Sequence, residues 1–115
     1  RVNTKVIDAA GCATELNERG GPVTAEELRL LTGELRACCG EVDILSIAGS
    51  LPQGVEKDFY RDIILAAREV NPDIIIALDC SGEALYHGFS AAPDIIKPNR
   101  GELAGLLSFH SLSYP

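Results

Sequence analysis

The chain has 115 residues, a hydrophobic content of 46% and a formal net charge of −7 at pH 7, a composition typical of one compact globular domain. The acidic balance argues against a protein that holds nucleic acid or an anionic membrane through its net charge. No apolar run is long enough to span a bilayer and the first residues carry no signal-peptide pattern, so we expect a soluble cytoplasmic protein without nucleic-acid or membrane partners.

The N-terminal segment predicts an antiparallel β-hairpin. Residues 2–7 and 12–16 are two short runs around a turn that contains glycine, which is a hairpin pattern. The polar side chains of Arg1, Asn3 and Lys5 alternate along the first strand and therefore share one face. That face is suited either to binding a phosphorylated substrate or to simple exposure to solvent.

A helix is expected after a loop rich in glycine and proline at residues 17–22. Thr24-x-x-Glu27 has the pattern of a capping box at a helix start, and Gly40 is expected to end the helix. Apolar residues at helical spacing predict one buried face. They are Leu28, Leu31, Leu35 and Cys38.

The rest of the chain alternates apolar strands with helices. Strands are predicted at residues 42–48, 74–78 and 94–97, and helices at 57–70, 81–85 and 99–107. This alternation implies parallel strands with right-handed crossovers, and hence an α/β fold with a layered, mostly parallel sheet flanked by helices. The nearly continuous apolar runs favour strands that are covered on both faces.

Polar residues follow all three predicted strands. Gly49 and Ser50 come after the first strand, Asp79 after the second, and Lys97 after the third. Because parallel sheets bind ligands outside the carboxyl ends of their strands, we expect these loops to form a cleft for an anionic ligand and its metal.

Each of these segments also has a purely structural interpretation. Gly49 and Ser50 are consistent either with close approach of the backbone to a phosphate or with an ordinary strand-to-helix loop. No Walker A motif is present. Asp79 suits Mg²⁺ or a turn. Asn99 and Glu102 suit either a phosphate and metal site at a helix N-terminus or a second capping box.

The four cysteines are Cys12, Cys38, Cys39 and Cys80. None stands in a C-x-x-C pair and neither histidine lies near a cysteine in sequence, which argues against a zinc site. No basic neighbourhood favours a catalytic thiolate. We expect small buried hydrophobic residues in a reducing compartment, with Cys38 and Cys39 at a helix end.

Five segments in order, residues 1–5, 13–18, 49–54, 78–85 and 96–103, resemble the ribokinase-like (PfkB) family of carbohydrate kinases. The similarity is to its sugar-phosphate branch, of the 1-phosphofructokinase or tagatose-6-phosphate kinase type, and it covers residues 1–107. The resemblance implies a ribokinase-like α/β core with a small β lid over the sugar.

The resemblance also implies a role for each matching residue. Phosphoryl transfer depends mainly on positioning and charge neutralisation, which such polar residues supply. For the sugar-phosphate substrate these are Arg1, Asn3, Gly49 and Ser50; for ATP, Lys97 and Asn99; for Mg²⁺, Glu102 and, as a second acidic residue, Asp79.

The resemblance places two family elements outside this chain. A sugar-binding segment with an early aspartate and paired glycines would precede Arg1. A Gly-Ala-Gly-Asp element, which supplies the anion hole and the catalytic base, would follow Pro115. We therefore assign no catalytic base and expect a central fragment that is inactive alone, with a partial β-lid hairpin at 1–20, a partial kinase core at 21–107 and an atypical tail at 108–115.

The expected reaction is ATP-dependent phosphorylation of a phosphorylated ketohexose, with Mg²⁺, by the intact enzyme. Ala48 and Gln53 replace a serine and a proline that are frequent in this branch, and both look tolerable. Alternatives are a ribose or nucleoside kinase of the same family, and a truncated α/β fragment that only binds. A homodimer through the lid is a possible assembly of the intact enzyme.

Overall fold

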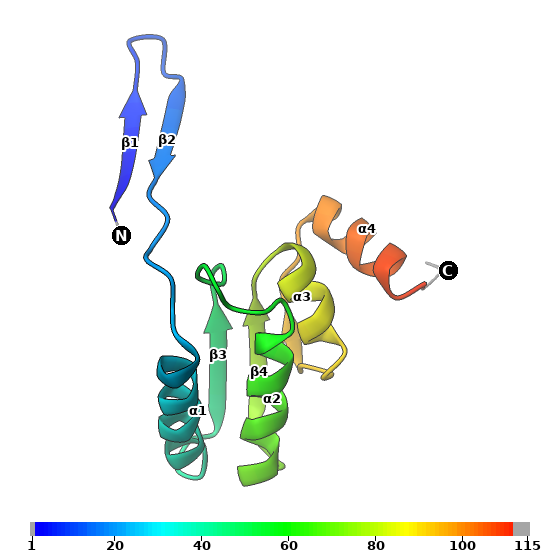
Figure 1. Cartoon of the computed structure of the whole chain (residues 1–115). Helices are drawn as coiled ribbons and strands as arrows, with labels where there is room; N and C mark the ends of the chain where they lie inside the picture. Colours follow the sequence, from blue (N-terminus) through cyan, green and yellow to red (C-terminus); the bar gives the residue numbers. More distant parts are fainter. Residues whose placement is uncertain (1, 112–115) are drawn as a thin grey trace.

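The computed structural model describes residues 2–111 and shows the predicted order of elements (Figure 1). The predicted fold class, an α/β fold with a parallel sheet flanked by helices, is confirmed. Within the described residues, no helix is long and apolar enough to cross a membrane. The elements are β1 (Asn3–Ile7), β2 (Ala13–Asn17), α1 (Ala25–Cys39), β3 (Ile44–Ala48), α2 (Phe59–Val70), β4 (Ile75–Asp79), α3 (Gly82–Phe89), β5 (Ile95–Ile96) and α4 (Arg100–Phe109).

The central sheet has the order β3-β4-β5 and is parallel throughout. Its last strand, β5, has two residues where four were predicted. The reason lies at Asp94, whose carboxylate accepts a hydrogen bond from the Ile76 backbone N–H at 2.8 Å. Pro98 follows on the other side and has no N–H to donate to a ladder. Regular pairing is therefore confined to the residues between them.

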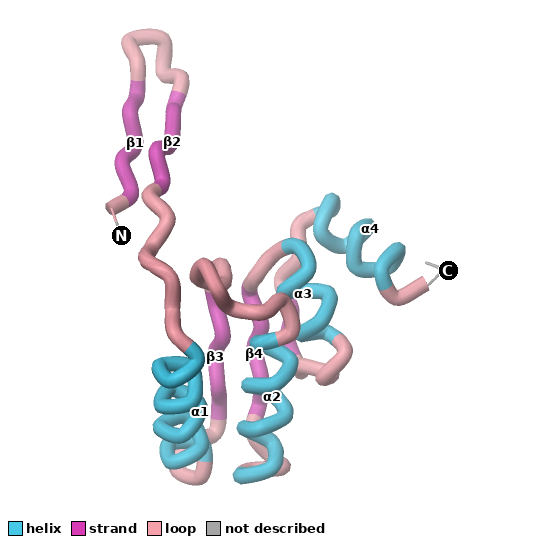
Figure 2. The backbone as a smooth tube through the Cα atoms, viewed as in Figure 1, coloured by secondary structure: helices cyan, strands magenta, loops and turns pink. Residues whose placement is uncertain are grey.

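The hydrophobic core lies between the sheet and the helices on one of its faces. Figure 2 shows the backbone course of these helices and strands. Ile76 and Leu78 point into the core from β4, Ile64 comes from α2, and Leu85 comes from α3; each is at most 1% exposed. The contact of α3 with the sheet is so close that a Cβ on Gly88 would lie 2.6 Å from a Leu78 methyl carbon. A side chain at residue 88 would therefore push α3 away from β4.

The opposite face of the sheet is bare among the described residues. The register places Ile44, Ile75 and Ile95 on this face, and they are 59%, 41% and 55% exposed. The expectation that the strands are covered on both faces is therefore wrong for the described part of the chain, because residues 2–111 supply helices to one face only. Parallel sheets normally have both faces covered.

Helix α1 begins as predicted but buries a different face. Thr24 Oγ1 accepts from the Glu27 N–H at 3.2 Å, and Glu27 Oε2 accepts from the Thr24 N–H at 2.7 Å, which confirms the capping box. The prediction that Leu31 and Cys38 are buried is wrong, since both are exposed. The inward face consists of Leu28, Thr32, Leu35 and Cys39. Residues 32 and 39 take the inward positions expected for residues 31 and 38, because α1 is turned slightly about its axis relative to the expected orientation.

The C-terminal helix is longer than predicted. Helix α4 continues to Phe109 rather than ending at residue 107. The Phe109 ring lies 5.3 Å from the Tyr86 ring and 5.1 Å from the His87 ring, measured between centroids. Residues 108–111, the described part of the predicted atypical tail, therefore end a helix that packs on α3.

The hairpin formed by β1 and β2 stands apart from the layered body (Figure 1). Every residue from 2 to 19 is exposed. The two strands pair antiparallel, as predicted, with Thr4 opposite Leu16 and Lys5 opposite Glu15. An isolated two-stranded hairpin is marginal in water, so this one depends on a surface that the described residues do not supply.

The two faces of β4 lead to a first prediction. Ile76→Ala removes a fully buried side chain and should lower the free energy of unfolding by about 2–5 kcal/mol. The neighbouring Ile75→Ala, on the bare face, should cost less than about 1 kcal/mol. Urea unfolding of the 115-residue chain compares the two variants. Equal losses would contradict the one-sided core.

Asp94 leads to a second prediction. The Ile76 N–H and then the Arg68 guanidinium, at 3.0 Å, hold the pKa of Asp94 below its ordinary value. A lowered folded-state pKa adds stability above the unfolded-state pKa, and this stability is lost as the pH falls through the folded-state value. Asp94→Asn should therefore destabilise the chain at neutral pH and progressively less below about pH 4.

The measurement is urea unfolding of the Asp94→Asn variant across this pH range. Asp73→Asn, in the turn before β4, removes the same charge from a carboxylate without a hydrogen bond or ion pair among residues 2–111 and is the matched control at pH 7. A loss of stability for Asp94→Asn that is the same at every pH would contradict the assignment.

Candidate functional site

The carboxyl ends of the three parallel strands lie in a row, as predicted. The Gly49 N–H, after β3, donates to the Asp79 carbonyl oxygen of β4 at 3.0 Å. The Asp79 carboxylate in turn lies 3.4 Å from the Lys97 ammonium after β5. The structure thus brings Gly49, Asp79 and Lys97 together along one edge of the sheet.

The loop after β3 is held in place by two hydrogen bonds and approaches the segment before α1 closely at a glycine. The Tyr60 hydroxyl of α2 donates to the Gly49 carbonyl oxygen at 3.1 Å. The Val23 N–H, in the segment before α1, donates to the Gln53 carbonyl oxygen at 3.1 Å. Gly54 has a φ of +82°, and a Cβ there would lie 3.3 Å from the Val23 carbonyl oxygen. Glycine therefore permits both the turn and the close approach of the two segments.

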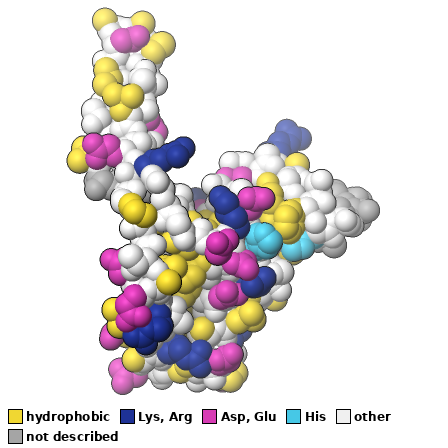
Figure 3. All heavy atoms as spheres, viewed as in Figure 1, with side chains coloured by type: hydrophobic (Ala, Val, Ile, Leu, Met, Phe, Trp, Pro, Cys, Tyr) yellow, Lys and Arg dark blue, Asp and Glu magenta, His cyan; other side chains and the backbone are white. Residues whose placement is uncertain are grey.

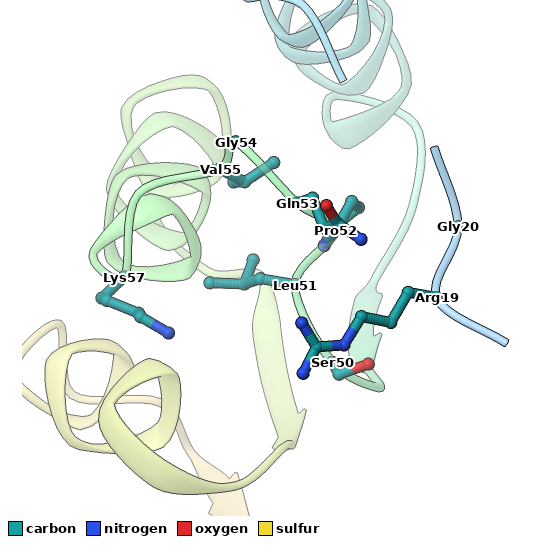
Figure 4. Close-up of a pocket in the computed structure, with 9 residues that line it drawn as sticks. All are labelled: Arg19, Gly20, Ser50, Leu51, Pro52, Gln53, Gly54, Val55 and Lys57. Carbon is teal, nitrogen blue, oxygen red and sulfur yellow. The ribbon is translucent and has the colours of Figure 1, made fainter. Parts of the chain in front are cut away.

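A cavity of about 520 Å³ opens beside this loop (Figure 4). Its size is in the range of small-molecule sites. Sequence reasoning identified Ser50 here but missed the two basic residues of the lining, because they lie in separate segments with no shared motif. The lining residues are Arg19, Gly20, Ser50, Leu51, Pro52, Gln53, Gly54, Val55 and Lys57.

The surface around the edge is basic in places despite the net charge of −7. Figure 3 shows Lys and Arg side chains bordering the hollow at the foot of the hairpin. Lys97 is 80% exposed although it pairs with Asp79. An exposed ion pair of this kind is weak and exchanges readily with an incoming anion.

Asn99 and Glu102 form a capping box at the start of α4. Asn99 Oδ1 accepts from the Glu102 N–H at 2.9 Å, and Glu102 Oε2 accepts from the Asn99 N–H at 2.8 Å. The structural interpretation of this pair is therefore confirmed. It does not exclude ligand binding, because a capping box leaves other N–H groups of the first helical turn without intrahelical partners.

Cys80 directly follows Asp79 in the chain. Burial raises the pKa of Cys80 to about 11, with further contributions from the negative charges of Asp79 and Glu102. Residues 2–111 hold no group of three or more His, Cys, Asp or Glu side chains arranged for a metal ion. One or two carboxylates completed by water and phosphate oxygens are the usual protein contribution to Mg²⁺, and Asp79 and Glu102 are residues of that type.

The hairpin residues are not brought to the strand edge. Asn3 is exposed on β1, opposite Asn17, and its polar face also holds the ion pair between Lys5 and Glu15 at 3.4 Å. Arg1 lies outside the described residues.

The cysteines are free, and two of the four are buried. Cys39 and Cys80 lie in the core, whereas Cys12 and Cys38 are exposed. The prediction of buried cysteines is therefore wrong for Cys12, in the exposed hairpin, and for Cys38, because the inward face of α1 runs through Cys39.

Comparisons with known proteins extend these observations. The sequence profile described as pfkB family carbohydrate kinase matches residues 1–112. The chain is 36% identical over 103 residues to 1-phosphofructokinase of Escherichia coli strain K12, which covers 90% of this chain and 32% of that protein. It is 35% identical over 101 residues to tagatose-6-phosphate kinase of Staphylococcus epidermidis, covering 86% and 32%.

Solved structures agree with the sequence matches. Phosphofructokinase-2 from Escherichia coli in complex with potassium superposes with a TM-score of 0.80 at 31% identity, over 92% of this chain and 34% of that one. A possible 1-phosphofructokinase from Thermotoga maritima has the same fold, with a TM-score of 0.75 at 24% identity, over 86% and 32%. The chain thus spans about one third of the length of the relatives it matches.

The cysteine environments lead to a third prediction. At pH 8 a thiol with a pKa of about 11 is ionised in about one molecule in a thousand, and only the thiolate reacts. An aromatic disulfide reagent should therefore modify Cys12 and Cys38 quickly and Cys80 slowly in the folded chain. All four thiols should react in urea.

Mass spectrometry of the labelled peptides identifies the modified residues. A Cys12→Ser, Cys38→Ser variant serves as the control and should retain no fast-reacting thiol. Rapid labelling of Cys80 in the folded chain would contradict its placement in the core.

Proposed function

The chain belongs to the pfkB family of carbohydrate kinases, and from this membership we propose that the protein that carries it transfers the γ-phosphoryl group of ATP to a hydroxyl group of a phosphorylated ketohexose. Relatives named 1-phosphofructokinase and tagatose-6-phosphate kinase support the substrate class. The observation that carries the proposal is the row formed by Gly49, Asp79 and Lys97 at the strand edge. Free thiols and the use of ATP favour a cytoplasmic location.

The loop after β3 is proposed to bind the sugar phosphate. Gly49 has a φ of +96° and no atom within 4 Å of the position its Cβ would occupy, so the backbone leaves room for a ligand. The Ser50 hydroxyl lines the cavity and is available to donate to a phosphate oxygen. Arg1 and Asn3 are proposed to complete the substrate site from the hairpin.

Lys97 and Asn99 are proposed to bind the phosphates of ATP. Lys97 carries its charge at the end of β5, and Asn99 stands directly before the first turn of α4. The N-terminal end of a helix attracts anions through its unpaired N–H groups and its dipole. Together these groups oppose the negative charge of the transferring phosphoryl group.

Glu102 and Asp79 are the residues that would hold Mg²⁺. When bound, the ion would neutralise phosphate charge during transfer. The Asp79 carboxylate would then exchange its contact with Lys97 for the ion and leave Lys97 to a phosphate oxygen. No residue of this chain is assigned as the base that deprotonates the sugar hydroxyl.

The hairpin is proposed to act as a partial lid, residues 1–20, on a partial kinase core, residues 21–107. One hairpin face is apolar and exposed, with Val6 at 50% and Leu16 at 59%. Such a face gains from burial, and we propose that a second copy of the protein covers it in a homodimer. A related phosphofructokinase-2 structure is described as tetrameric.

The test uses the longest natural chain that carries this sequence. A panel of fructose 1-phosphate, tagatose 6-phosphate, ribose and adenosine, each with Mg·ATP, should show turnover with a phosphorylated ketohexose. Lys97→Gln should lower kcat/KM about 100-fold or more, because it removes a charge that stabilises the transition state. Arg29→Gln, in an exposed ion pair on α1, is the matched control and should leave the rate unchanged.

Turnover with ribose or adenosine alone would contradict the substrate class and favour the ribose or nucleoside alternative. Full activity of Lys97→Gln would contradict the proposed role of the strand edge. The 115-residue chain by itself should show no turnover, and activity there would contradict the absence of a base from this chain.

A further inference from the structure

Arg19 and Lys57 stand out because they are the basic residues of one cavity. Most other Lys and Arg side chains in residues 2–111 form ion pairs with carboxylates. Arg19 and Lys57 form no ion pair and no side-chain hydrogen bond within the described part of the chain, yet both line the cavity beside the loop after β3. In a chain with a net charge of −7, two basic side chains without carboxylate partners at one place call for an explanation.

The cavity lining contains no acidic residue. Figure 4 shows the Arg19 and Lys57 side chains extending into the space beside Leu51 from opposite sides of the loop. The local charge of the lining is therefore positive although the chain as a whole is acidic. A local positive charge of this kind attracts an anion. The net negative charge of the chain would instead repel it.

The loop adds uncharged donors to these two cations. Among the hydrogen bonds of residues 2–111, none is donated by the backbone N–H groups of Ser50, Leu51, Gln53 or Gly54, or by the Ser50 hydroxyl. Consecutive free N–H groups in a turn favour anion binding. Two basic residues and several residues with free N–H groups thus line the same cavity.

The basic side chains are held on segments that the fold fixes. Arg19 lies a few residues before Val23, whose N–H is bonded to the loop at Gln53. The close approach at Gly54 keeps these two segments together. Lys57 stands directly before Asp58, the N-cap residue of α2. Both residues therefore lie, along the chain, close to segments that the fold holds in place.

We propose that Arg19 and Lys57, with the donors of the 50–54 loop, form an anion site that binds the phosphate group of a phosphate monoester. A phosphate monoester carries between one and two negative charges at neutral pH and offers three acceptor oxygens, which matches two cations and several N–H donors. Identification of the monoester as the sugar phosphate substrate rests on the proposed function. The two residues would then select a phosphorylated sugar over an unphosphorylated one.

The test measures binding of inorganic phosphate to the ¹⁵N-labelled 115-residue chain by nuclear magnetic resonance. Phosphate should shift the amide signals of Ser50, Leu51, Gln53 and Gly54. Arg19→Gln and Lys57→Gln should each weaken binding about fivefold, since each removes a charge-assisted hydrogen bond at an exposed site. Arg29→Gln removes the same charge from α1 outside the cavity and should leave the dissociation constant unchanged.

A second measurement covers the case in which the short chain or a variant does not fold. In the longest natural chain that carries this sequence, phosphate should protect Arg19, and not Arg29, from phenylglyoxal, as read by mass spectrometry. Absence of shifts at the loop amides, equal affinity of the Gln variants, or absence of protection at Arg19 would each overturn the proposal.

Phosphate binding at the anion site and kinase activity can be tested separately. Arg19→Gln should raise the KM for the sugar phosphate and leave kcat and the KM for ATP nearly unchanged. Phosphate binding that depends on Arg19 and Lys57 in a protein without kinase activity would overturn the proposed function and support the anion site. Kinase activity that is indifferent to both substitutions would overturn the identification of the bound monoester as the sugar phosphate substrate.

Discussion

The parallel pairing of β3 with β4 is the constraint on which the candidate site depends. Pairing of Ala48 with Asp79 at the end of the ladder brings the Gly49 N–H to the Asp79 carbonyl oxygen. The shorter β5 then places Lys97 beside the Asp79 carboxylate. Because the carboxyl ends of parallel strands meet at one edge, three loops that are distant in sequence become neighbours, and a change of register would separate them.

This edge of the sheet carries positively charged side chains although the net charge of the chain is negative. Lys97 is paired with a carboxylate, whereas Arg19 and Lys57 are left without one in the part of the chain that the structure describes. Anion binding here therefore depends on a few placed side chains and on free backbone N–H groups. These are short-range contacts, which are screened less than the general field of a protein surface.

The layered body is asymmetric. Helices cover one face of the sheet, while Ile44, Ile75 and Ile95 are exposed on the other, and the hairpin contributes no buried residue. The chain spans about one third of the length of its relatives, and both apolar surfaces gain free energy if further polypeptide covers them. The site edge lies between these two surfaces, so its full shape depends on what covers them.

The sequence by itself determined the order of elements, the parallel α/β class and the helix starts at Thr24 and Asn99, because capping boxes, breakers and apolar periodicity are local signals that few other conformations satisfy. Only the tertiary structure decided which face of α1 is buried. Spacings of three and four residues fit a face through Cys38 as well as one through Cys39, and packing against the sheet selects between them. The Asp79–Lys97 pair and the cavity that joins Arg19 to Lys57 were also decided there, since contacts between distant segments leave no periodic pattern in a single sequence.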